Sequence, residues 1–242
     1  MNGLIEGFLL AAVPTICAIT LHEAAHGYAA LAMGDDTARR AGRLSLNPLA
    51  HVDPVGTVLL PGFLLISQLL TLGQVAFMFG WAKPVPVAAW RFRHPRRGMM
   101  VVAAAGPAMN FFLAWLGMLS LHGFGLLPGP MVAPAFSFVS YWLLVNVVLG
   151  LFNLLPIPPL DGGRIVVGLL PEAAARHWAR LERAGLLIVL GGVFLLPTVL
   201  AHYGIRFDPV RSLLAWSAGP LLRVLAALAG HPGLADLFLG ND

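Results

Sequence analysis

The sequence predicts an all-α, polytopic membrane protein, and its composition, its hydropathy and its long apolar runs all favour that fold class. Of the 242 residues, 58% are hydrophobic and only 11% are charged, and the mean hydropathy is +0.82. A soluble domain usually carries about 25% charged residues, so a water-soluble fold of this length could not hide so much apolar surface. Several apolar runs also reach the roughly 20 residues with which a helix crosses a bilayer. We therefore expect the lipid bilayer to surround the chain.

Six apolar runs give the expected helices in chain order. The first run exceeds one span and contains Pro14, which predicts a kink. We expect a single integral membrane domain over 1–242, with a core over about 4–170 and further C-terminal helices over about 171–242. The weakest run, the last, fits either a final span or an interfacial helix. The runs cover residues 4–33, 55–80, 98–121, 136–155, 184–200 and 212–229.

The loops between the runs predict the topology. Residues 34–54, 81–97 and 171–183 are rich in arginine, whereas 122–135 holds no Lys, Arg, Asp or Glu. Basic loops stay in the cytoplasm, so we expect these three on the cytoplasmic side and 122–135 outside. The pI of about 10 also invites a nucleic-acid partner. We expect none, because membrane anchoring accounts for cations in short loops between apolar runs.

The run over 55–80 conflicts with this topology if it crosses the membrane once, because two basic loops would then lie on opposite faces. A re-entrant hairpin keeps both loops on one face, and we favour it over the single crossing. Pro61-Gly62 and Ser67-Gln68 are the expected breaks, and broken backbone is tolerated at membrane depth only against protein or water.

The segment Lys83-Pro84-Val85-Pro86-Val87 follows the hairpin. Its two prolines exclude a helix, so we expect extended chain that forms a short edge strand near the membrane surface. An edge strand could hold an extended peptide by strand addition.

Two histidines toward the end of the first run form the strongest candidate for a functional site. His22 and His26 are four residues apart, about 400° on a helix, so both imidazoles project from one face. Two such nitrogens can hold one zinc ion at about 2.0–2.1 Å, and Glu23 lies beside that face. Ionisable residues inside an apolar helix are costly and mark function by default. The alternative is a histidine pair that faces water at a helix end.

Asp161 is the candidate for a third ligand. Three prolines in four positions, Pro156, Pro158 and Pro159, end the preceding helix, and Gly162 lets the chain turn sharply. Such an unwound stretch can aim a carboxylate at a buried site. The spacing fits equally well with Asp161 as the N-cap of the helix that follows.

Three motifs together resemble the site-2 protease family of intramembrane zinc metalloproteases, over about residues 15–170. The stretch from Asn47 to Val87 is similar to a compact prokaryotic branch of that family, without the PDZ domain that many relatives insert. The motifs are His22-Glu23-x-x-His26, Gly106-Pro107-x-x-Asn110 and Asn153-x-x-Pro156-x-Pro158-Pro159-Leu160-Asp161-Gly162.

The resemblance implies a zinc-dependent endopeptidase that cuts peptide bonds in or near transmembrane segments of membrane proteins. It implies one zinc ion per chain, bound by His22, His26 and Asp161, with Glu23 as the catalytic acid and base. It also implies a catalytic core of three helices, here about 4–33, 98–121 and 136–155. The expected partners are a transmembrane protein or peptide substrate and the lipid bilayer, and the expected place is a prokaryotic cell membrane with the site toward the cytoplasm. Regulated intramembrane proteolysis and clearance of signal-peptide remnants both fit this activity.

Three further polar residues are candidates for supporting roles. Asn110 and Asn153 could hydrogen-bond the oxyanion or the substrate backbone, or they could tie helices together. His51 could gate the site or offer a resting-state ligand, or it could serve only to cap a loop.

Two alternatives remain open on the sequence alone. Another membrane metallopeptidase class shares the first motif but takes a downstream glutamate as third ligand, for which Glu172 is the first candidate. A catalytically inactive protein of the same fold could act in binding or transport, although binding zinc alone does not require Glu23.

Overall fold

The computed structural model describes residues 2–73 and 80–239, and all regular structure in these two stretches is helical. The expected all-α class is therefore confirmed. The helices are α1 (Asn2–Ala32), α2 (Thr37–Arg40), η1 (Pro48–His51), η2 (Pro54–Leu59), α3 (Leu60–Leu72), η3 (Ala89–Arg91), α4 (Pro95–Ser120), η4 (Leu121–Leu126), α5 (Gly129–Asn153), α6 (Asp161–Leu169), α7 (Glu172–Arg180), η5 (Leu181–Ala184), α8 (Gly185–Ile188), η6 (Val189–Leu195), α9 (Leu196–His202), α10 (Pro209–Leu228) and α11 (Leu234–Leu239).

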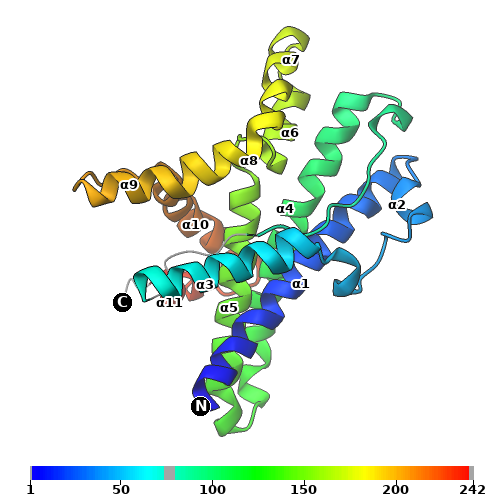
Figure 1. Cartoon of the computed structure of the whole chain (residues 1–242). Helices are drawn as coiled ribbons and strands as arrows, with labels where there is room; N and C mark the ends of the chain where they lie inside the picture. The colour runs from blue at the N-terminus through cyan, green and yellow to red at the C-terminus, as the bar shows by residue number, and fades with distance from the viewer. Residues whose placement is uncertain (1, 74–79, 240–242) are drawn as a thin grey trace.

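The expected three-helix core is formed by α1, α4 and α5, each of which packs against the other two. In Figure 1, α1 and α5 rise from the end that holds the N-terminus, and α4 runs the opposite way between them. α5 begins at Gly129, so residues 129–135 are helical and the loop expected over 122–135 is shorter than the sequence predicted. Pro130 does not prevent this, because the first helical turn needs no backbone N–H donor there.

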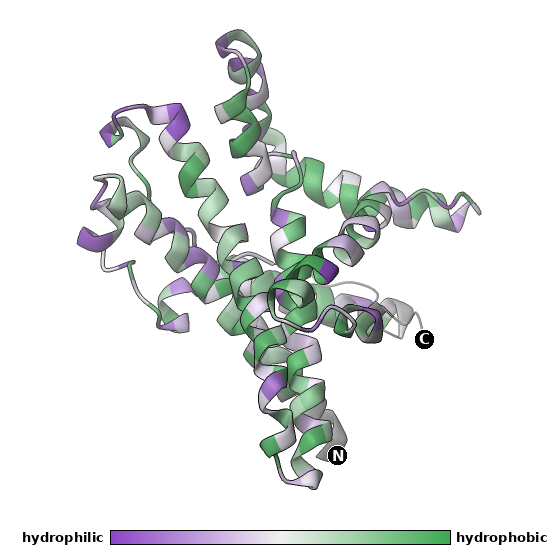
Figure 2. Cartoon of the chain, turned by 180° about the vertical axis from the view of Figure 1, so that it is seen from behind, coloured by the Kyte–Doolittle hydropathy of each residue, from purple (hydrophilic) through white to green (hydrophobic). Residues whose placement is uncertain are grey.

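The chain is a multi-pass membrane protein. In the described stretches, four helical segments are long and apolar enough to span a bilayer: Pro54–Thr71, Pro95–Leu126, Gly129–Asn153 and Glu172–His202. Figure 2 shows apolar residues along the long helices and hydrophilic residues gathered near α2, at the start of α4 and in α7.

Helices η2 and α3 run away from the core, and Trp81 then lies beside the first residues of η2. The Trp81 backbone N–H donates to the Gly56 carbonyl over 3.1 Å, and the Thr57 hydroxyl donates to the Trp81 carbonyl over 2.9 Å. Both flanks of this excursion thus lie together, as the hairpin requires and a single crossing does not. Residues 74–79 of the expected hairpin lie outside the described part.

The two breaks expected within this excursion are absent, because the helix runs unbroken from Pro54 to Leu72. Pro61 stands where the π-helical turns of η2 pass into α3, and this change of helix type accommodates its missing N–H. Ser67 and Gln68 both hydrogen-bond back to the Leu64 carbonyl, so their polar groups are satisfied without breaking the helix.

The edge strand expected over 83–87 is not formed: this segment has no regular secondary structure. Proline excludes helix there, as expected, but a strand also needs a partner strand, and the described part of the chain offers none. Its backbone is held by single contacts instead. The Lys83 N–H donates to the His51 carbonyl over 2.8 Å, and the Arg43 guanidinium donates to the Lys83 carbonyl over 2.6 Å.

Asp35 anchors the far end of this segment to the turn after α1. The side chain is fully buried, and its carboxylate accepts from the Ala88 N–H over 2.6 Å and from the Thr37 N–H over 3.0 Å. Burial by itself would raise the pKa of Asp35, but the hydrogen bonds from Thr37 and Ala88 outweigh it and hold the pKa below its usual 3.8. Asp35 is therefore ionised at neutral pH.

We expect Asp35→Ala to loosen residues 83–91 and to lower the free energy of unfolding by about 1–3 kcal/mol, because buried N–H donors lose their acceptor. Since the folded pKa lies below the unfolded one, this stabilisation is present above the unfolded pKa and is lost as pH falls through the folded pKa. Hydrogen exchange of Ala88 at neutral pH measures the effect. Glu172→Ala is the matched control, because its exposed carboxylate pairs with Arg176 of its own helix at the surface. Equal effects of the two substitutions would contradict the anchoring role.

The run over 212–229, whose path the sequence left open, forms α10, which packs against α4 and α5. Leu222, Leu225 and Ala226 of α10 are buried in one apolar cluster with Met118 of α4 and Leu143 of α5. α10 thus packs on the core helices α4 and α5.

Candidate metal centre

The three residues expected to bind zinc come together inside the helical core. His22 and His26 lie one turn apart on α1, and Asp161 is the first residue of α6. Asp161 Oδ2 lies 3.1 Å from His22 Nε2 and 3.3 Å from His26 Nε2. The three side chains are 7%, 12% and 8% exposed, in the order His22, His26 and Asp161. In the described part of the chain they form the one group of histidine, cysteine or acidic residues whose ligand atoms converge, all within 4.8 Å.

These separations fit a single metal ion. Ligands bound to zinc at about 2.0–2.1 Å in tetrahedral positions lie roughly 3.3–3.4 Å from one another. The two distances from Asp161 Oδ2 to the histidine nitrogens are close to that value. Three protein ligands leave a fourth position open, which is the arrangement of catalytic rather than structural zinc sites.

The protonation pattern of the two rings also favours a cation. His26 Nδ1 lies 2.7 Å from the Val102 carbonyl, which can only accept, so this nitrogen carries the proton. His22 Nδ1 lies 2.6 Å from Asn110 Oδ1, also an acceptor. In neutral rings both Nε2 lone pairs then point at Asp161 Oδ2, which is buried and has no hydrogen-bond donor. Three acceptors facing one another match a metal-binding site.

Asp161 does not serve as the N-cap that the sequence left as an alternative. Leu160 occupies the N-cap position of α6, and no side chain caps this helix end. The carboxylate of Asp161 turns instead toward α1, where both of its close partners lie.

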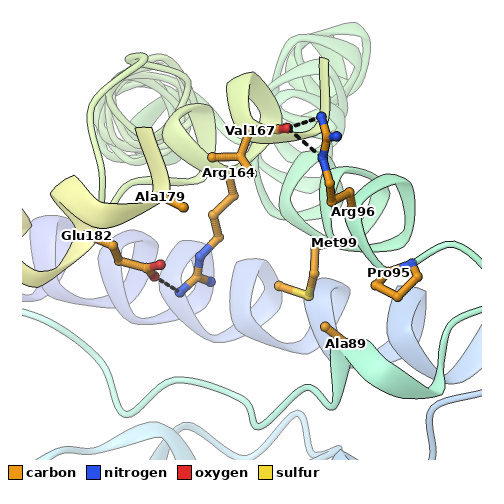
Figure 3. A pocket seen from close by; sticks show the side chains of 8 residues that line it. All are labelled: Ala89, Pro95, Arg96, Met99, Arg164, Val167, Ala179 and Glu182. Carbon is orange, nitrogen blue, oxygen red and sulfur yellow. Dashed lines mark hydrogen bonds and ion pairs between the residues drawn. The ribbon is translucent and has the colours of Figure 1, made fainter. Parts of the chain in front are cut away.

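Close backbone packing holds α6 in the position that allows this. A Cβ at Gly162 would overlap the Leu154 carbonyl oxygen, so only glycine lets the start of α6 approach the end of α5. The C-terminal end of α6 is held by Arg96 of α4, whose guanidinium donates to the Val167 carbonyl over 2.9 Å and also to the Leu170 carbonyl. Figure 3 shows Arg96 reaching across to Val167. Both ends of the helix that carries Asp161 are therefore fixed to the core.

Gly106 of α4 lets that helix lie directly against the two imidazoles. A Cβ at this position would stand 2.5 Å from His26 Cε1 and 2.6 Å from His22 Nε2. Real side chains do not approach so closely, so even alanine must displace one ring. This is the physical reason for a glycine in the Gly106-Pro107-x-x-Asn110 motif.

We expect Gly106→Ala to weaken zinc binding by displacing His22 Nε2, a candidate ligand atom, while the helix itself gains propensity. Zinc affinity of the purified protein, measured by competition with a chromophoric chelator, reports the loss. Gly192→Ala is the matched control, because a Cβ there meets no atom within 4 Å. Unchanged affinity in Gly106→Ala would show that the rings do not bind the metal in this arrangement.

Glu23 lies beside the histidines and also contacts the segment that follows the hairpin. Its Oε2 accepts a hydrogen bond from the Val85 backbone N–H over 3.1 Å. Val85 is buried, and its Cγ1 would stand 3.1 Å from a Cβ at Gly27, so this segment packs directly against α1. The carboxylate is thus placed between the candidate metal ligands and residues 83–88.

The three supporting candidates take different places. Asn110 is fully buried and lies behind His22, on the ring nitrogen that faces away from Asp161, which matches the helix-tying alternative. Asn153 donates to the Leu149 carbonyl of its own helix over 3.0 Å. His51 is buried with its Nε2 2.8 Å from the Ser45 carbonyl, and it is not part of the converging group.

Asn146 of α5 is a functional candidate that the sequence reasoning missed. It is fully buried and its Oδ1 accepts from Asn110 Nδ2 over 3.0 Å. The available signal was a single amide in the middle of an apolar run, seven residues before Asn153 and so on nearly the same helix face.

A downstream glutamate does not take the place of Asp161. The side chain of Glu172 is 74% exposed and its nearest partner is Arg176 of its own helix, at 3.9 Å. Glu182 is likewise exposed and pairs with Arg164 over 3.0 Å, as Figure 3 shows.

Comparison with known proteins gives the same assignment as the motifs. The model of peptidase family M50 matches residues 129–198, which include Asp161. The chain is 41% identical over 186 residues to "Putative zinc metalloprotease YwhC" of Bacillus subtilis, covering 74% of this chain and 77% of that protein. It is 30% identical over 229 residues to "Putative zinc metalloprotease Rip2" of Mycolicibacterium smegmatis, covering 91% and 82%. No solved structure gives a significant match.

These similarities extend over most of this chain and over most of each relative, and the relatives' names agree with a zinc-binding site. The three motifs lie in the helices that converge at His22, His26 and Asp161. The chain therefore belongs to peptidase family M50, the site-2 protease family.

Proposed function

We propose that this protein is a zinc-dependent endopeptidase that hydrolyses peptide bonds within or near the transmembrane segments of membrane proteins. The observation that carries the proposal is the convergence of three buried acceptor atoms, from His22, His26 and Asp161, with Glu23 beside the two histidines on α1. A site that served only to bind metal would not need that fourth ionisable group among apolar helices.

The ligand set fits one zinc ion per chain, held by His22, His26 and Asp161. Bound there, zinc would supply Lewis-acid chemistry, activating water and polarising a carbonyl group. Glu23 takes the proton from the attacking water and delivers it to the leaving amine, which is the work of a general acid and base. The hydrogen bond from Val85 holds the Glu23 carboxylate in place before substrate arrives.

The depth of the site supports cleavage inside the bilayer. His22 lies ten residues before the end of α1 at Ala32, which corresponds to about 15 Å along the helix. The loops at that end of α1 and at the start of α4 are the basic ones, which supports a site toward the cytoplasmic side of a prokaryotic cell membrane. The substrate is a single helix or peptide that enters from the membrane and unwinds beside Glu23 and residues 83–88.

Cleavage in liposomes tests this proposal. The purified protein is reconstituted together with a single-span membrane protein that carries a different tag at each end. We expect two fragments, loss of cleavage after a zinc chelator, and recovery on addition of zinc but not magnesium. Cleavage that continues in protein shown by metal analysis to be metal-free would contradict the proposed chemistry.

A further inference from the structure

The two histidines of the candidate metal centre are oriented by different kinds of acceptor. His26 Nδ1 faces the Val102 carbonyl, which can only accept, so its proton position follows from that one contact. His22 Nδ1 faces the side-chain amide of Asn110. An amide can present either its oxygen or its NH2 group, so this contact alone leaves two tautomers of His22 available. Only the tautomer protonated at Nδ1 leaves Nε2 free to bind a metal.

A chain of buried amides removes that ambiguity. It starts at the Trp142 carbonyl, which can only accept and therefore takes the Nδ2 group of Asn146 over 2.9 Å. Asn146 must then turn its Oδ1 toward Asn110, whose Nδ2 donates to it over 3.0 Å. The second hydrogen on Asn110 Nδ2 faces the Ala18 carbonyl at 3.3 Å. The oxygen of Asn110 is left for His22 Nδ1, at 2.6 Å.

The direction of this chain is set by the backbone carbonyls of Trp142 and Ala18 and not by the imidazole. Reversing Asn110 would bring its oxygen against the Ala18 carbonyl and Asn146 Oδ1, which are both acceptors. Asn110 and Asn146 are both fully buried, so water cannot supply the hydrogen-bond donors that these facing acceptors would lack. Asn146 therefore acts on His22 from a third helix, across Asn110.

We propose that Asn146 is a positioning residue that fixes the tautomer of His22 through Asn110. The amide chain itself is independent of the proposed function, but its use for metal binding rests on that function. Residues that hydrogen-bond the non-ligating ring nitrogen of a metal-binding histidine fix its tautomer and orientation. Their loss typically weakens metal affinity about 10–100-fold.

Two substitutions of equal shape separate the polarity of Asn146 from its packing. In Asn146→Thr the hydroxyl can donate to the Trp142 carbonyl four residues earlier and can still accept from Asn110. Asn146→Val has the same outline but no hydroxyl. The readout is the imidazole 15N spectrum of the full-length, metal-free protein at about pH 8.5 in an Asp161→Ala background, because the Asp161 carboxylate, 3.1 Å from His22 Nε2, would otherwise accept from a protonated Nε2 when no metal is bound. The His22 signals are identified by their loss in His22→Gln.

In the Asp161→Ala background we expect His22 to be protonated at Nδ1 when Asn146 is present and in Asn146→Thr, and the tautomer protonated at Nε2 to gain population in Asn146→Val, where the Ala18 carbonyl alone still orients Asn110. With Asp161 in place, we also expect zinc affinity to fall about 10–100-fold in Asn146→Val and to stay within a few-fold of wild type in Asn146→Thr. A role in packing alone would change thermal stability and leave the tautomer unchanged.

The proposal is overturned if Asn146→Val keeps the wild-type tautomer and zinc affinity, or if both variants shift the tautomer equally. A wild-type protein that binds no zinc would refute the proposed function instead. The 15N spectrum of the metal-free protein would still decide the role of Asn146 in that case.

Discussion

Glu23→Gln is expected to lower the rate of peptide-bond cleavage by about 10²–10⁴-fold while the protein keeps its zinc. Glutamine is nearly the same size as glutamate and its oxygen can still accept from the Val85 N–H, so the local packing persists. It cannot take up the proton of the attacking water, and that step is the one assigned to Glu23. The rate is measured with the tagged single-span substrate in liposomes, and zinc is counted by elemental analysis of the same preparation.

Glu182→Gln is the control for this substitution, because Glu182 is an exposed acid paired with Arg164 outside the metal centre. We expect wild-type cleavage from the control. Cleavage by Glu23→Gln at the wild-type rate would show that Glu23 is not the catalytic acid and base. The metal centre is tested separately, by the zinc binding of Asp161→Ala.

Asp161→Ala is expected to lose zinc and, with it, cleavage. The substitution removes one of three ligands and leaves two histidine nitrogens with no anionic partner. Its effect on zinc affinity should exceed the roughly 10–100-fold loss that follows removal of a residue behind a ligand. Zinc stoichiometry and affinity of the purified protein measure the change, and a thermal unfolding curve verifies that the helical core has formed.

Glu172→Ala provides the comparison, since a downstream glutamate is the third ligand in the alternative class of membrane metallopeptidases. The exposed Glu172 side chain pairs with Arg176, so we expect full zinc binding and cleavage. If Asp161→Ala keeps zinc and activity and Glu172→Ala loses both, Glu172 and not Asp161 is the third zinc ligand.

Local periodicity predicted the parts of the site that lie on one helix. The spacing of His22 and His26 places both rings on one face of α1, and the structure keeps them 4.7 Å apart between ring centroids. Asp161 was harder, because spacing fitted an N-cap equally well and only the motif favoured a ligand. The structure joins it to the histidines through the approach of α6 to α5 at Gly162, a contact that no local pattern specifies.

The contacts that sequence reasoning missed all cross between helices. Three such contacts appear only when α4 and α5 are placed against α1. They are the Val102 carbonyl next to His26, the packing of Gly106 against the two imidazoles, and the amide of Asn146 next to Asn110. Hydropathy identifies an apolar run as a helix but does not say which of its faces meets which neighbour. The same limit explains the error over 83–87, where proline excluded a helix but the sequence could not show that residues 2–73 and 80–239 offer no partner strand.

The central claim is that this protein cuts a peptide bond inside the bilayer with a metal held by His22, His26 and Asp161. Mass spectrometry of the two substrate fragments from zinc-loaded liposomes tests it most directly, because it locates the bond that breaks. We predict new termini within the apolar span of the substrate for the wild type, and neither fragment for Asp161→Ala or Glu23→Gln. Termini found only in the water-soluble flanks of the substrate, or identical fragments from all three proteins, would contradict it.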